Sequence, residues 1–118
     1  MREMIARMGT IRGDVMHQVF AVPGSVTVRS AREFAQNLLT EFEAGQDLDL
    51  DLSVLAEVDL SFVQLIHAAR DHWARAGRSL RLAHPAGEPV TALLDRAGFL
   101  TDLAPQDLDF WFHGDMPR

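Results

Sequence analysis

The chain of 118 residues contains no cysteine, no tyrosine and no lysine, so all 11 of its basic residues are arginine. These absences exclude a thiolate nucleophile, a thiolate metal site, a Schiff-base lysine and the phosphate-binding loop that requires lysine. The eight glycines form neither a dinucleotide-binding fingerprint nor a hydrolase nucleophile elbow. We therefore expect a protein that is not an enzyme and that has no catalytic residues, no cofactor and no resident metal.

Positive charge is also scarce. The 17 acidic residues outnumber the 11 arginines and give a net charge of -6. No arginine lies between Arg32 and Arg70. Binding to nucleic acid or to an anionic membrane depends on clustered cations, so neither is expected as the main partner. The segment Met1 to Met8 is too short and too charged for a signal peptide or a membrane-spanning helix. We expect a cytoplasmic protein without direct membrane insertion.

The composition, 47% hydrophobic and 24% charged, predicts one globular domain over residues 1–118. Val15 to Val22 and Val26 to Val28 are typical of short strands around the turn at Pro23-Gly24. An amphipathic helix should follow Ser30, with Ser30 and Glu33 as a capping box and Gly45 as its end. The apolar positions that predict this helix are Ala31, Phe34, Ala35, Leu38, Leu39 and Phe42.

Residues 47–52 alternate strictly between aspartate and leucine. In a strand, this pattern places Leu48, Leu50 and Leu52 on one face and the three carboxylates on the other. The acidic row is either a solvated sheet face or a cation site. A solvated face is favoured, because loops that bind hard cations take their ligands from a turning backbone.

The rest of the chain predicts a second helix ending at Gly77, a strand over Leu80 to Leu82 and a short helix from Pro89 to Gly98. His67 and Asp71 are spaced to offer two metal ligands on one face of a helix, but the sequence offers no third ligand, so a solvated polar face is favoured. The C-terminal segment should pack back on the domain, or it binds a partner. Its four apolar residues are Leu108, Phe110, Trp111 and Phe112.

Residues 50–65 resemble the core of the STAS domain family, named for sulfate transporters and anti-sigma factor antagonists. In that family an Asp-Leu-Ser strand end is followed by a loop and then by Asp-Ser-Ser/Thr-Gly-Leu at the start of a helix. The resemblance extends from about residue 15 to residue 103. It implies a single α/β STAS-like domain with a four- to five-stranded mixed sheet and helices packed mainly on one face, which agrees with the predicted order βαβαβα.

The resemblance implies that Asp59 is the family's aspartate and that Ser61 is the residue presented to a partner serine kinase. Leu60 stands where the family has a small polar residue, and Phe62 stands where it has glycine. With Gln64, these residues form the expected partner-contact region. Ser61 and Gln64 also have capping-box spacing, so the Ser61 hydroxyl is a helix cap, a phosphoacceptor, or both.

The function implied by the resemblance is that of an anti-sigma factor antagonist in a bacterial partner-switching pathway. The partner would be a serine kinase or anti-sigma factor with the histidine-kinase-like ATPase fold. The alternative is a STAS subunit bound permanently to a transport ATPase in lipid trafficking. A third alternative is small-molecule binding in a pocket at a sheet edge. Because the contact region lacks arginine, we expect the partner's face to be basic.

Overall fold

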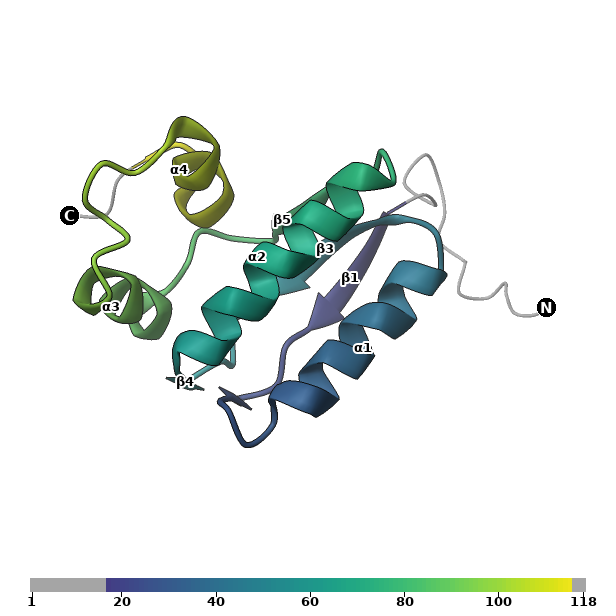
Figure 1. The fold of residues 1–118 in the computed structure, drawn as a ribbon, viewed down its shortest axis with the longest axis horizontal. Helices are drawn as coiled ribbons and strands as arrows, with labels where there is room; N and C mark the ends of the chain where they lie inside the picture. The colour runs from purple at the N-terminus through teal and green to yellow at the C-terminus, as the bar shows by residue number, and fades with distance from the viewer. Residues whose placement is uncertain (1–16, 116–118) are drawn as a thin grey trace.

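The computed structural model describes residues 17–115, which form five strands and four helices (Figure 1). The strands are β1 (His17–Ala21), β2 (Ser25–Val26), β3 (Asp47–Asp51), β4 (Glu57–Val58) and β5 (Leu80–Leu82). The helices are α1 (Ala31–Glu43), α2 (Leu60–Arg75), α3 (Glu88–Arg96) and α4 (Pro105–Phe112). Val15 and Met16, expected in the first strand, lie outside the described residues.

The described strands form two small sheets. One has the order β1-β3-β5 and the other pairs β2 with β4, and every pairing is parallel. The expected four- to five-stranded mixed sheet is therefore not present within residues 17–115. The chain bends at Pro23 and Gly24, which separates β1 from β2 and moves the β2–β4 pair away from the main sheet.

Helices α1 and α2 lie side by side across one face of the main sheet (Figure 1). Leu48 and Leu50 of β3 are buried against them, as the alternation predicted, whereas the three aspartates of this strand are half-buried. Leu52 is only partly buried, because β3 ends at Asp51. The core is completed by the apolar stripes of the helices, which include Phe34, Leu38, Phe62, Ile66, Trp73, Val90 and Leu94.

Helix α1 begins after Ser30 as predicted, but the capping box of Ser30 and Glu33 does not form. The Ser30 hydroxyl makes no bond to the first turn of the helix. It accepts a hydrogen bond from the N–H of Thr27 at 3.2 Å, so it stabilises the turn before the helix. The helix ends at Glu43, and Gly45 follows two residues later with a φ of +84°, a left-handed conformation that glycine adopts without strain.

The aromatic C-terminal segment packs on the domain as helix α4. Phe110, Trp111 and Phe112 are all buried, and the Trp111 carbonyl accepts a hydrogen bond of 2.7 Å from the N–H of Ala86. The Trp111 ring lies 6.3 Å from the ring of Phe62, between centroids. This segment therefore completes the core, and the alternative that it is a free partner-binding patch is wrong.

Candidate docking surface at the start of helix α2

Asp59 connects two distant parts of the chain at the start of α2. As the N-cap of this helix, it accepts a hydrogen bond from the N–H of Ser61 through Oδ1 at 2.9 Å. Its Oδ2 accepts a second one from the N–H of Val28, also at 2.9 Å. Both oxygens therefore fix the turn between β2 and α1 to the first turn of α2, and we call this arrangement the Asp59 latch.

The same contacts change the acidity of Asp59. The N–H of Val28 makes the largest contribution to lowering the pKa of this carboxyl. Desolvation opposes it, and the N–H and hydroxyl of Ser61 add smaller contributions that lower the pKa further. Hydrogen bonds donated to a carboxylate stabilise its charged form. Asp59 is therefore a carboxylate at neutral pH, and it is negatively charged where α2 begins.

Ser61 lies two positions deeper in α2 than the helix cap that its spacing with Gln64 predicts. The helix begins at Leu60, and Asp59 rather than Ser61 occupies the N-cap. The predicted capping box of Ser61 and Gln64 is therefore wrong, because the residue two positions earlier takes that role. Ser61 is half-buried in the first helical turn, with its N–H bonded to Asp59.

The expected contact residues divide between surface and core. Leu60 and Gln64 are exposed, and Asp59 and Ser61 are half-buried. Phe62 is fully buried, with its ring stacked 5.9 Å from that of Phe34. Its assignment to the partner-contact region is corrected, because a side chain inside the core supports the surface from below and does not contact a partner.

Two exposed valines from other segments belong to the same end of the molecule as Leu60. Val28 is attached to Asp59 by the latch. Val54 lies in the loop after β3, where the Gly24 carbonyl accepts hydrogen bonds from Ala56 and Glu57 at 2.8 and 3.0 Å. We call Val28, Val54 and Leu60 the apolar tip. Periodicity could not find it, because the three residues lie on different segments that only the tertiary structure brings to one end.

Charged side chains of both signs lie beside the Asp59 latch. Arg29, Glu57 and Asp59 line one hollow of about 470 Å³ beside the latch, together with Ser25 and three neighbouring residues. Arg29 precedes the arginine-free stretch in sequence, so it was not assigned to this surface. The hollow therefore carries both signs of charge, whereas residues 59–64 themselves contain no arginine.

Residues 17–115 contain neither a metal site nor a membrane-spanning helix. No group of three or more His, Asp or Glu side chains in this part of the chain is arranged to hold a metal ion. None of its helices has the length and apolar character required to cross a bilayer.

A family model described as "Mlab, STAS domain" matches residues 10–105, which is most of the chain. No curated protein and no solved structure matches the chain. The matched range contains both small sheets, helices α1 to α3, the Asp59 latch and the apolar tip. The chain therefore belongs to the STAS domain family, as the motif at residues 50–65 predicted.

Proposed function

We propose that this protein is a non-enzymatic regulatory module that binds a protein partner through the apolar tip and the first turn of α2. The partner is a serine kinase or anti-sigma factor with the histidine-kinase-like ATPase fold, and phosphorylation of Ser61 controls the affinity. The module thus acts as an anti-sigma factor antagonist in a cytoplasmic, bacterial partner-switching pathway.

The observation that carries this proposal is the exposed apolar surface at a rigid place. Val28, Val54 and Leu60 are large apolar side chains left in water at an end where hydrogen bonds fix the backbone. Exposed apolar side chains that are rimmed by polar groups are typical of protein-binding surfaces. A surface that is already ordered loses little conformational entropy on binding, which favours affinity.

The position of Ser61 supports its role as the phosphoacceptor. The first turn of a helix presents free N–H groups and the positive end of the helix dipole, which stabilise a phosphate. Arg29, in the hollow that Asp59 also lines, adds a cation to this end. A phosphate placed there changes the charge of the docking surface without requiring the core to unfold.

One observation favours a second function, in which the protein is a constant subunit of a transport ATPase and is not phosphorylated. The Asp59 carboxylate accepts the N–H of Ser61 and lies against its hydroxyl. A phosphate on Ser61 would be repelled by this charge and would compete for the same N–H. In this function the latch holds the docking surface in one state.

The docking surface is tested by comparing two valines of almost equal exposure. Val54, at the tip, is 65% exposed, and Val19, on β1, is 62% exposed. Partners captured from native cells by the wild-type protein should be lost with Val54→Asp and retained with Val19→Asp. If both variants are equally folded and both lose the partners, or both retain them, the binding surface lies elsewhere.

The two functions are separated at Ser61, using the partner that was captured. If phosphorylation controls binding, Ser61→Asp weakens the complex, Ser61→Ala preserves it, and mass spectrometry finds phosphoserine at this position in protein from native cells. In a constant subunit, both variants bind in proportion to their folded fraction and phosphoserine is absent. A kinase-like partner agrees with the first function and a transport ATPase with the second.

A further inference from the structure

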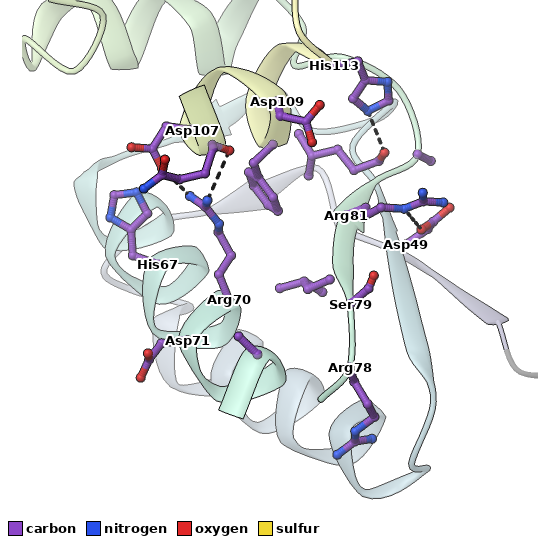
Figure 2. A pocket seen from close by; sticks show the side chains of 16 residues that line it. Asp49, His67, Arg70, Asp71, Arg78, Ser79, Arg81, Asp107, Asp109 and His113 are labelled. Carbon is purple, nitrogen blue, oxygen red and sulfur yellow. Dashed lines mark hydrogen bonds and ion pairs between the residues drawn. The ribbon is translucent and has the colours of Figure 1, made fainter. Parts of the chain in front are cut away.

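A groove of about 930 Å³ lies along β5. It borders the C-terminal half of α2, whereas the apolar tip lies at the N-terminal end of this helix. Figure 2 shows it between the C-terminal half of α2, strand β5 and helix α4. Its walls are held together by Arg70 of α2, which forms an ion pair of 2.8 Å with Asp107 of α4 and lies over the Phe110 ring. The groove is therefore a rigid feature of the domain.

Strand β5 is an edge strand of the main sheet, because the order is β1-β3-β5. Ser79 and Ala83 turn their backbone groups toward β3: the Ser79 carbonyl accepts from Leu48, and the N–H of Ala83 donates to Leu50. Backbone direction alternates along a strand, so Leu80 and Leu82 turn their N–H and C=O groups outward into the groove. These are the groups that an additional strand would bind.

Only part of this edge is occupied within the described residues. The carbonyl of Leu82 lies 2.9 Å from Nε2 of His113, and no described residue bonds to the N–H or C=O of Leu80 or to the N–H of Leu82. Natural proteins often protect an edge with a charged side chain laid across it. Arg81 also lines the groove, but it extends toward Asp49 of β3, 3.5 Å away, and so is turned away from the free edge (Figure 2).

Arg78 and Asp109 lie toward opposite ends of the groove and carry opposite charges (Figure 2). Arg78, before β5, lies over the Phe42 ring and donates to the Phe42 carbonyl at 2.8 Å, and it has no carboxylate partner within residues 17–115. Asp109 of α4, at the other end, is exposed and likewise has no cation partner in that range. A ligand that fits this groove has a negative and a positive end.

We propose that this groove binds an extended peptide segment of a protein partner as an added strand beside β5. The backbone of the segment pairs with Leu80 and Leu82, a carboxylate side chain faces Arg78, and a cationic side chain faces Asp109. Main-chain hydrogen bonds supply the affinity in this mode of recognition, and side chains supply the specificity. The site is separate from the apolar tip and does not depend on the function proposed for it.

The backbone part of this proposal is tested by titrating the ¹⁵N-labelled full chain with the blocked peptide Glu-Val-Thr-Val-Thr-Val-Lys. The amides of Leu80 and Leu82 should shift and exchange more slowly with solvent, whereas the amide of Arg81, which faces β3, should not change. The same peptide N-methylated at every internal residue should cause no change. If the methylated peptide has the same effect, or if the shifts lie at Val28 and Leu60, the proposal is overturned.

The charge part is tested with a second peptide in which the terminal lysine is replaced by glutamate. The wild-type protein should bind the first peptide, which ends in lysine, about two- to fivefold more tightly than the second, which ends in glutamate. This is the range expected for one exposed ion pair. Asp109→Lys should reverse this preference. The control Asp95→Lys, an equal charge change at an exposed position of α3 outside the groove, should keep it. An unchanged preference in Asp109→Lys would overturn the proposal.

A second copy of the chain is the competing occupant of this edge. Without peptide, the amides of Leu80 and Leu82 could become protected from hydrogen exchange as the protein concentration rises. If sedimentation then shows dimers, β5 pairs with β5 of a second copy. That result would overturn the assignment to a partner segment, whereas a monomer that shows protection only with peptide supports it.

Discussion

The centre of β3 and the start of α2 use apolar side chains in opposite ways. In β3, Leu48 and Leu50 are completely enclosed by the helical layer. At the start of α2, Leu60 faces water, as does Val28, and order comes from backbone hydrogen bonds to one carboxylate. The first region supplies the stability of the fold, and the second uses that stability to keep an apolar surface available.

This difference explains why the apolar tip does not collapse into the core. Burying Leu60 or Val54 would gain hydrophobic free energy, but the Asp59 latch fixes the backbone beside Leu60, and the Gly24 carbonyl holds the loop that carries Val54. Phe62 already fills the space beneath the tip. The four stability predictions below test whether the two regions are as different as this account requires, beginning with the largest expected effect.

Leu50→Ala should lower the free energy of unfolding by about 2 to 5 kcal/mol, because it removes a fully enclosed side chain and leaves a cavity. Val54→Ala should change it by no more than about 0.5 kcal/mol. Urea denaturation of both variants measures the contrast. A loss of similar size in the two would mean that Val54 belongs to the core.

Asp59→Ala should lower the free energy of unfolding by about 0.5 to 2 kcal/mol, the usual effect of losing a helix N-cap. The latch adds a specific local effect: the amide of Val28 should exchange faster with solvent than in the wild-type protein. Hydrogen exchange of that amide is the measurement. Unchanged exchange at Val28 would show that the latch does not hold the turn before α1.

The acid dependence of stability should report the same latch. The pKa of Asp59 is lowered in the folded protein, so its contribution is complete above the unfolded pKa of about 4 and is lost as the pH falls through the folded value. The stability difference between the wild-type protein and Asp59→Asn should therefore be constant near neutral pH and shrink below about pH 4. A difference that grows on acidification would contradict this sign.

Ser61→Ala should have the smallest effect, below about 0.5 kcal/mol, because Asp59 and not Ser61 caps the helix. Thermal denaturation of this variant beside Asp59→Ala makes the comparison. A loss as large as that of Asp59→Ala would restore the capping role that the sequence suggested for the Ser61 hydroxyl.

Much of the fold could be predicted from local patterns. Helix α1, strand β3 and strand β5 lie where periodicity placed them, because a buried face imposes its repeat on the sequence. The arrangement of the sheets could not be predicted. Strands β2 and β4 have two residues each, too few for a repeat, and their pairing depends on contacts between distant segments.

The candidate site was predicted in part. The motif located Asp59, Leu60 and Ser61, but two residue types that both favour N-caps lie within two positions, and sequence alone could not choose between them. Val28 and Arg29 join this site through the hydrogen bond from the N–H of Val28 to Asp59, which is 31 residues away in the sequence. The groove beside β5 is likewise formed by elements that only the tertiary structure brings together.

The proposal that the apolar tip is the docking surface is tested most directly by substituting two leucines of similar exposure. Leu60, at the tip, is 42% exposed, and Leu39, on α1, is 46% exposed. The dissociation constant of the purified partner should rise at least about tenfold for Leu60→Asp, equivalent to about 1.4 kcal/mol, and stay within about twofold of the wild-type value for Leu39→Asp. Equal affinities of the two variants, both folded, would contradict the account.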